Sequence, residues 1–123
     1  MRFRPIAVIA VAALLAAIAA VAAVALSTAA AAGDSASVSI RDDLFSPKRV
    51  KVDRGGKVTW RWKGDNEHNV RFRKVPQGAD RPKGSKLQSE GRFTRTFSGK
   101  RGLYRYVCTI HQDLGMRGSV EVE

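Results

Sequence analysis

Four side chains that can bind a soft or borderline metal ion are the most distinctive feature of the sequence. The chain has one cysteine, two histidines and a single methionine besides Met1. Cys108, His111 and Met116 fall within nine residues of one another, and His68 lies earlier in the chain. The spacing C-x2-H-x4-M suits a loop that folds back over one ion. We therefore expect a single metal site built from these four residues.

The donor types restrict the identity of the ion. Calcium and magnesium prefer oxygen ligands, and this set offers two imidazoles, one thiolate and one thioether. Zinc accepts cysteine and histidine, but a structural zinc site rarely recruits methionine. Copper is the ion for which two histidines, one cysteine and a weak axial methionine form an electron-transfer site. The set favours copper, with zinc as the alternative.

Each of these residues also has a simpler interpretation when it is taken alone. An inward-facing histidine such as His68 is more often a core residue than a ligand. A lone cysteine commonly packs as a small hydrophobic residue, and a loop methionine commonly fills a gap. On this interpretation the protein is a basic interaction module that binds no metal, with Cys108 buried or bridging a dimer. The combined spacing of the four residues argues against it.

The elements that would position the site are short β-strands. From Val38 onward apolar and polar residues alternate with a period of two, and turn residues recur at regular intervals. We expect an all-β antiparallel sandwich with Greek-key connections, a turn at Gly55-Gly56, a long polar connection over 75–91 and a bulge or edge position at Arg95. The predicted core is Val38, Ile40, Phe45, Val50, Val52, Val58, Trp60, Trp62, Val70, Phe72, Phe93, Phe97, Tyr104, Tyr106, Val120 and Val122. His68 and Cys108 share the inward face of their strands, so one end of the sandwich can bring them together.

Two motifs make the sequence resemble the cupredoxins, the small type 1 blue copper proteins, and among them the plastocyanin-like group. The segments FSPKRVKVDRGGKVTWRWKGDNEHNV and YRYVCTIHQDLGMRGSVEV follow the group's two signatures in the expected order. The resemblance implies one copper ion, a cupredoxin-like fold and copper ligation by His68, Cys108, His111 and Met116. It also implies that Asn69 braces the ligand loops by hydrogen bonds and that His111 turns one ring edge toward solvent.

Two features depart from that group. The residue before the second histidine is often proline in plastocyanins and is Ile110 here. The acidic patch of photosynthetic plastocyanins is absent, so a photosynthetic role is not expected.

The first 36 residues do not belong to the sandwich. Arg2 and Arg4 precede an apolar run over 6–26, and small residues with A-x-A patterns follow it. This order is typical of an export signal, although the run is long enough to remain as an N-terminal membrane anchor. We expect a signal or anchor helix in residues 1–36 and a copper-binding domain in residues 37–123. Either way the domain lies outside the cytoplasm, in the periplasm or on the extracellular face of the membrane, anchored or released.

The residues after the apolar run are strongly basic. They hold 20 Lys and Arg against 11 Asp and Glu, a net charge of +9. Such a surface favours a redox partner with an acidic docking surface, or it serves only to keep the protein soluble. Nucleic acid is not an expected partner for a protein outside the cell, and we expect a monomer.

These observations predict a one-electron carrier that shuttles between redox proteins and cycles between copper(II) and copper(I). A copper enzyme needs further histidine-rich sites, and both histidines are already used in one site. We therefore do not expect an enzyme. The alternative is a copper-binding or copper-delivery protein of the cell envelope that uses the same ligands.

Overall fold

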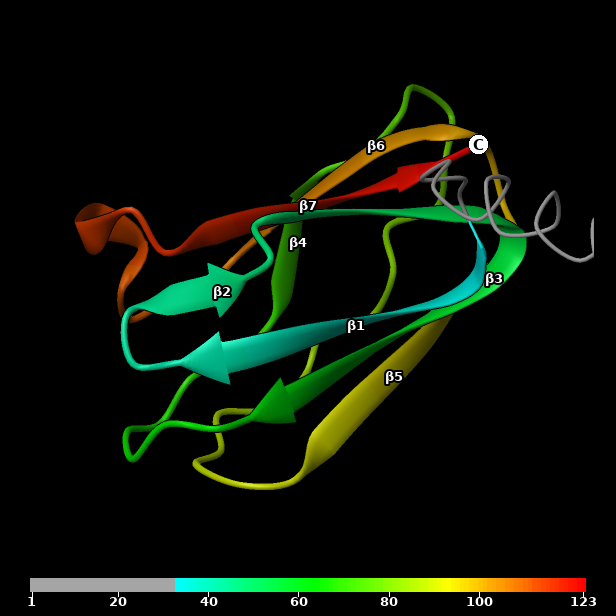
Figure 1. Ribbon diagram of the computed structural model, residues 1–123. Coiled ribbons are helices and arrows are strands. Elements are labelled where there is room, and N and C mark those ends of the chain that lie inside the picture. The colour runs from blue at the N-terminus through cyan, green and yellow to red at the C-terminus, as the bar shows by residue number, and fades with distance from the viewer. Residues whose placement is uncertain (1–32) are drawn as a thin grey trace, which may run out of the picture. The chain divides into compact units, whose positions relative to one another are not determined.

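Two layers of β-strands make up the described part of the chain, residues 33–123 of a computed structural model (Figure 1). The elements in chain order are β1 (Gly33–Arg41), β2 (Leu44–Ser46), β3 (Arg49–Trp62), β4 (Arg71–Lys74), β5 (Arg92–Phe97), β6 (Gly102–Val107), the 3-10 helix η2 (Gln112–Leu114) and β7 (Arg117–Val122). The predicted signal or anchor over 1–36 lies almost entirely outside the described residues. Its boundary at residue 36 stays a prediction, and β1 begins at Gly33. Within residues 33–123 no helix is long and apolar enough to cross a membrane.

Strand β3 belongs to both layers. The hydrogen-bonded order is β2-β1-β3-β7-β6-β4, and β5 also pairs with β3. The first part of β3, Arg49 to Val52, pairs with β7, whereas Gly56 to Arg61 pairs with β5. One layer therefore contains β2, β1, the second part of β3 and β5, and the other contains the first part of β3 with β7, β6 and β4.

The predicted sandwich is confirmed. We expected only antiparallel strand pairs, but the sheet contains both parallel and antiparallel pairs. The pairs β1–β3 and β3–β7 are parallel. The chain reverses after β1 to form β2, and it reverses again before β3. Because of these two reversals, β3 runs in the same direction as β1.

The predicted turn at Gly55-Gly56 is a bend inside one continuous strand. Gly55 has a φ of +93°, a conformation that residues with a Cβ rarely adopt. A Cβ on Gly56 would lie 2.8 Å from the carbonyl oxygen of Asp53. The two glycines let β3 bend and pass from one layer to the other without ending.

The predicted core is buried between the layers, except that Phe93 is only partly buried. The Trp60 ring packs edge-on against Phe72 and Tyr106, with ring centroids 6.0 and 5.3 Å apart. Val107, Cys108 and Met116 add to the buried set at the end of the sandwich where the predicted ligands lie.

The long connection over 75–91 contains no strand, as predicted, but Gln88 forms an isolated β-bridge with His68.

For Arg95 the sequence predicted either a bulge or an edge position, and the structure shows the edge position. Strand β5 pairs with β3 alone and in regular register, so Arg95 lies on an edge strand and makes no bulge there.

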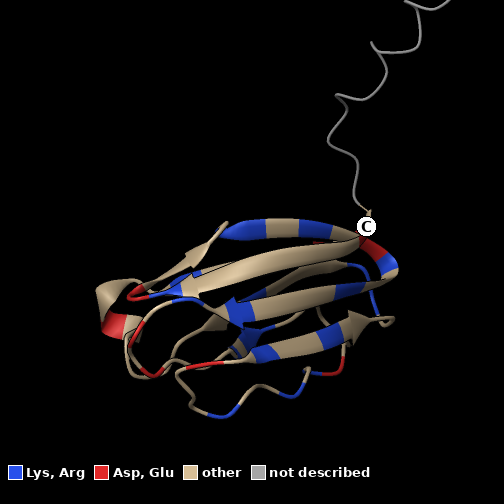
Figure 2. Ribbon diagram, turned by 60° about the horizontal axis from the view of Figure 1, so that its bottom comes forward, with Lys and Arg blue, Asp and Glu red and all other residues tan. Residues whose placement is uncertain are grey.

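Lys and Arg recur along the strands of both layers, whereas Asp and Glu lie mainly in turns and at strand ends (Figure 2). Basic side chains therefore cover the faces of the sandwich. The turns near the predicted ligands are acidic, with Asp42 and Asp43 between β1 and β2 and Asp65 and Glu67 before His68.

Candidate metal centre

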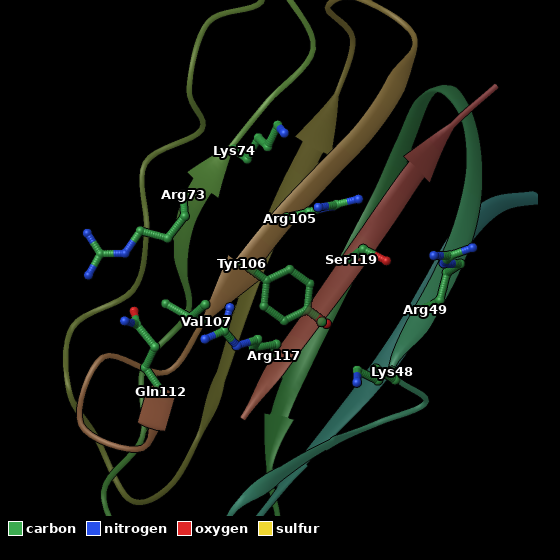
Figure 3. A pocket seen from close by; sticks show the side chains of 11 residues that line it. Lys48, Arg49, Arg73, Lys74, Arg105, Tyr106, Val107, Gln112, Arg117 and Ser119 are labelled. Atoms are coloured by element: carbon green, nitrogen blue, oxygen red, sulfur yellow. The ribbon is translucent and has the colours of Figure 1, made fainter. Parts of the chain in front are cut away.

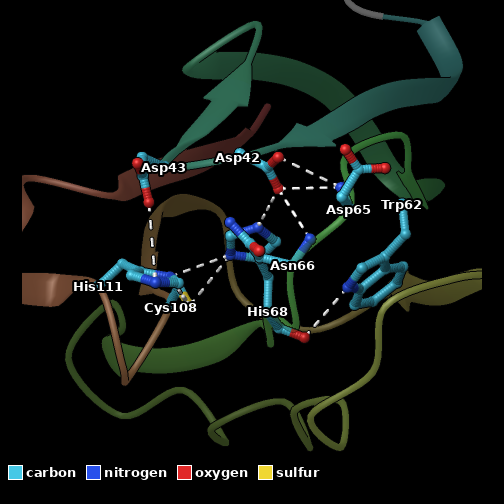
Figure 4. Close-up of polar contacts among 8 residues, drawn as sticks. All are labelled: Asp42, Asp43, Trp62, Asp65, Asn66, His68, Cys108 and His111. Carbon is cyan, nitrogen blue, oxygen red and sulfur yellow. Dashed lines mark hydrogen bonds and ion pairs between the residues drawn. The ribbon is translucent and has the colours of Figure 1, made fainter.

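Three of the predicted ligand side chains converge at one end of the sandwich (Figure 4). The Nδ1 atoms of His68 and His111 lie 3.1 Å apart. The Sγ atom of Cys108 lies 3.8 Å from Nδ1 of His68 and 3.6 Å from Nδ1 of His111. The three donor atoms thus form a small triangle whose corners come from two separate parts of the chain.

The backbone of His68 is fixed by the long 75–91 connection. Its N–H donates to the carbonyl of Gln88 at 2.9 Å, and the N–H of Gln88 donates back to the carbonyl of His68 at 3.1 Å. The indole N–H of Trp62 donates to the same His68 carbonyl at 3.0 Å. His68 is fully buried, so these bonds hold its ring against the core. The 75–91 connection, for which the sequence predicts no role, therefore positions the predicted ligand His68.

Asp42 fixes which nitrogen of His68 faces the other donors. Its Oδ1 accepts the backbone N–H of Asn66 at 3.0 Å and lies 3.1 Å from Nε2 of His68. The backbone N–H of Asn66, then the His68 ring and the backbone N–H of Asp65, hold the pKa of the Asp42 carboxyl below its usual value. An ionised carboxylate only accepts, so Nε2 carries the proton. The lone pair is then on Nδ1, which faces Cys108.

The loop after β6 brings Cys108, His111 and Met116 together. The Cys108 N–H donates to the Met116 carbonyl at 3.1 Å, and the N–H groups of His111 and Met116 donate to the carbonyls of Cys108 and His111, each at 3.3 Å. Gly115 ends the short helix η2 with a φ of +83°, which reverses the chain toward β7. Met116 is fully buried beside Cys108, which is also fully buried.

Asn69 joins the two segments that carry the donors. Its side-chain Oδ1 accepts the backbone N–H of Thr109 at 2.8 Å and the Thr109 hydroxyl at 3.3 Å. Since Asn69 follows His68 and Thr109 follows Cys108, these bonds tie the imidazole segment to the thiol segment. Such outer hydrogen bonds keep ligands in place around a metal.

His111 is the one donor of the triangle with access to solvent. Its side chain is 19 % exposed, and its Nε2 lies 3.7 Å from Oδ1 of Asp43, a distance too long for a hydrogen bond. The neighbouring side chains of Ile110 and Leu114 are 51 % and 69 % exposed. Two exposed apolar residues therefore lie close to His111 in the chain.

The triangle has the dimensions of a set of ligands around one ion. Metal–nitrogen and metal–sulfur bonds of about 2.0–2.3 Å place three trigonal ligands about 3.5–4.0 Å apart. The two sulfur–nitrogen distances, 3.8 and 3.6 Å, lie in this range, and the two nitrogens are somewhat closer, at 3.1 Å. Two imidazoles, a thiol and a buried methionine next to them fit a type 1 copper ion.

Asp42 and Asp43 were not identified from the sequence. They are consecutive residues of one turn, and each faces the Nε2 atom of a different histidine. No local pattern marks them, because only the folding of the β1–β2 turn over the site brings them there.

Comparison with known proteins agrees with this geometry. A family model described as copper binding proteins, plastocyanin/azurin family, matches residues 28–123. A plastocyanin of Prochlorothrix hollandica is 32 % identical over 105 residues, which are 80 % of each chain. A halocyanin of Natronomonas pharaonis is 40 % identical over 81 residues, 64 % of this chain and 48 % of the halocyanin. Oxidised plastocyanin of the fern Dryopteris crassirhizoma superposes with a TM-score of 0.61 at 26 % identity, covering 72 % of this chain and all of the fern protein.

Proposed function

The chain belongs to the plastocyanin/azurin family of copper-binding proteins, and on that premise we propose that it is a one-electron carrier working outside the cytoplasm. We propose that one type 1 copper ion is held by His68, Cys108, His111 and Met116. The observation that carries this proposal is the convergence of the two imidazole Nδ1 atoms and the Cys108 thiol within 3.8 Å of one another.

Bound copper supplies a one-electron couple between copper(II) and copper(I). The chain contributes a set of donors that is already assembled. Trp62, Gln88 and Asp42 hold His68, and Asn69 ties the His68 segment to the Cys108 loop. None of these bonds uses the donor atoms that face the proposed ion, so the bonds can hold the donors in place when the charge of the site changes. A preorganised site of this kind favours electron transfer over metal delivery, which requires the ion to leave.

The route for electrons leads through His111. Its ring is the donor with an exposed edge, and Ile110 and Leu114, close to it in the chain, expose apolar side chains. A partner that packs against these residues excludes water and comes close to the ring. His68 and Cys108, both fully buried, give no such access.

The number of metal sites distinguishes an electron carrier from a copper enzyme. In the part of the chain that the structure describes, His68, Cys108 and His111 are the one group that could hold a metal through three or more His, Cys, Asp or Glu residues. The sequence contains no third histidine. A copper enzyme with a separate substrate-binding copper would need one, and this supports a carrier.

The place of action follows from the start of the chain. Arg2 and Arg4, the apolar run over 6–26 and the small residues after it support export of the domain to the outer side of the cytoplasmic membrane. Mass spectrometry of the native protein distinguishes a released form from an anchored one.

Copper addition tests the function. The full chain mixed with copper(II) is expected to turn intensely blue through thiolate-to-copper charge transfer, and Cys108→Ser is expected to remain colourless. Ser98→Ala, an exposed change in the turn after β5, serves as the control and is expected to stay blue. A colourless wild-type protein contradicts the proposal. Fast copper loss to a chelator together with slow electron self-exchange would instead favour copper delivery.

A further inference from the structure

A hollow of about 760 Å³ opens on the layer formed by β3, β7, β6 and β4 (Figure 3). Its floor contains the buried residues Tyr106 and Gly118, and the Tyr106 ring lies against Gly118 (Figure 3). Six of its eleven lining residues are basic and none is acidic. We call this feature the basic hollow and define it by Lys48, Arg49, Arg73, Lys74, Arg105 and Arg117.

The positive charge of the basic hollow has no counterpart within residues 33–123. Next to the hollow on the same sheet, Nζ of Lys51 forms ion pairs with carboxylate oxygens of Glu121 and Glu123, at 3.8 and 3.7 Å. Within the hollow, Arg49 of β3 and Arg105 of β6 are the cross-strand neighbours of Ser119 on β7, so the residue between the two arginines is not acidic. In the described part of the chain none of the six cations forms an ion pair. A concave surface with uncompensated charge of one sign concentrates the field and attracts the opposite charge.

The basic hollow reaches the proposed copper ligands through the chain itself. Val107 precedes Cys108, Gln112 follows His111 and Arg117 follows Met116, and all three line the hollow. A molecule bound there lies beside the segments that carry three of the four donors. The hollow is therefore placed to hold a redox partner next to the site.

The exposed edge at His111 is less suitable for an acidic partner. Asp43 lies 3.7 Å from the ring, and Asp113 is exposed in η2 two residues further along the chain. These carboxylates repel acidic groups and leave the apolar contact as the attraction at that edge. The basic hollow, on the neighbouring face, supplies the attraction for negative charge.

We propose that the basic hollow docks a carboxylate-rich segment of the redox partner protein, an inference that rests on the proposed carrier function. Five of the six cations lie on four adjacent strands, which span about 14 Å at the usual spacing of neighbouring strands, and Lys48 directly precedes β3. They are the ends of exposed side chains and do not form a closed cage. Such an arrangement matches several carboxylates along an extended segment better than one compact anion.

The test compares two charge-reversed variants of the full chain, each recorded first for its blue colour. In R49E/R105E both changes lie in the basic hollow, and in R61E/R92E they lie on the other layer, where Arg61 and Arg92 are exposed neighbours on β3 and β5. The two variants have the same net charge. The probe is a fluorescent peptide of eight glutamates at low salt, with binding followed by anisotropy.

We expect R49E/R105E to weaken peptide binding about tenfold or more and R61E/R92E to weaken it less than threefold. Equal weakening in both variants would show that net charge alone attracts the peptide and would overturn the proposal. Binding of tripolyphosphate but not of the peptide would overturn it too, because the hollow would then be a compact anion site. A blue protein that fails to bind the peptide contradicts the docking proposal alone, whereas a colourless protein contradicts the carrier function.

Discussion

Asp42 and His68 lie 3.1 Å apart, from carboxylate oxygen Oδ1 to ring nitrogen Nε2, although 26 positions separate them in the chain. The same carboxylate accepts backbone N–H groups of Asp65 and Asn66. One residue of the β1–β2 turn therefore shapes the loop before His68 and sets the proton on its ring. A carboxylate behind a metal-binding histidine raises the basicity of the ligand.

Asp42→Asn is expected to raise the reduction potential. It removes a negative charge that stabilises copper(II), and loss of such an outer partner costs about 10–100-fold in metal affinity. If copper(II) alone is affected, each tenfold loss raises the potential by ~60 mV, which voltammetry measures.

Asp43→Asn is the matched control, since Asp43 is the next residue and makes no hydrogen bond to His111. Its φ of 66° suits asparagine, so the fold should not change. The reduction potential of Asp43→Asn is expected to change clearly less than that of Asp42→Asn. Equal shifts in the two variants would mean that charge alone matters, without positioning of His68.

Asn69→Ala is expected to destabilise the protein. The N–H of Thr109 loses its acceptor, and a partly buried donor without a partner costs about 1–3 kcal/mol. Urea unfolding measures the free energy, and a shift of the blue band would report movement of Cys108. Thr109→Val keeps the N–H bond and loses only the weaker hydroxyl bond at 3.3 Å, so a smaller loss is expected. An unchanged free energy of unfolding in Asn69→Ala would show that the bond contributes little.

Met116→Leu and Met116→Gln should move the reduction potential in opposite directions. The side chain is fully buried, and leucine has a similar volume, so the fold is expected to change by less than about 1.5 kcal/mol. Leucine removes a weak donor and favours copper(I), which raises the potential. Glutamine offers a harder oxygen, favours copper(II) and lowers it. If neither variant changes the potential, Met116 serves only as packing.

Tyr104 should make the stability fall in alkaline solution. Burial, together with the charge of Asp80, raises the pKa of Tyr104, and its hydroxyl donates to the carbonyl of Lys100. Because the folded-state pKa is above the unfolded value of about 10, the unfolded chain loses this proton first as the pH rises. The stabilisation is complete below pH 10 and declines above it, by at most about 1.4 kcal/mol per pH unit.

Tyr104→Phe is expected to flatten this decline in urea unfolding between pH 9 and 11. Burial raises the pKa of Tyr106 as well, so some decline should remain in the variant. Identical slopes in the wild type and Tyr104→Phe would contradict the assignment.

The period-two alternation predicted the core because each strand has one buried face, and burial of that face decides the register. The four candidate ligands could be predicted because cysteine, histidine and methionine are rare in this chain. The sequence predicts a turn at Gly55-Gly56 where the structure has a bend within β3, because a pair of glycines is compatible with a turn and with a bend inside a strand. Asp42, Asp43 and the basic hollow could not be predicted. Their residues are scattered in the sequence, and only the pairing of β3, β7, β6 and β4 and the folding of the β1–β2 turn bring them together.

Removal of copper should lower the stability without unfolding the sandwich. The bonds of His68 to Gln88, Trp62 and Asp42 do not involve the proposed metal, and the layers are held by a buried apolar core. The far-ultraviolet circular dichroism of the copper-free protein should therefore match that of the loaded protein. A ligand present at 100 times its dissociation constant stabilises by about 2.7 kcal/mol, so the melting temperature should fall on removal. Cys108→Ser, measured with and without copper, is the control and should show a much smaller difference. If the copper-free protein is unfolded, the donors are not preorganised, and the argument that favours a carrier over a delivery protein fails.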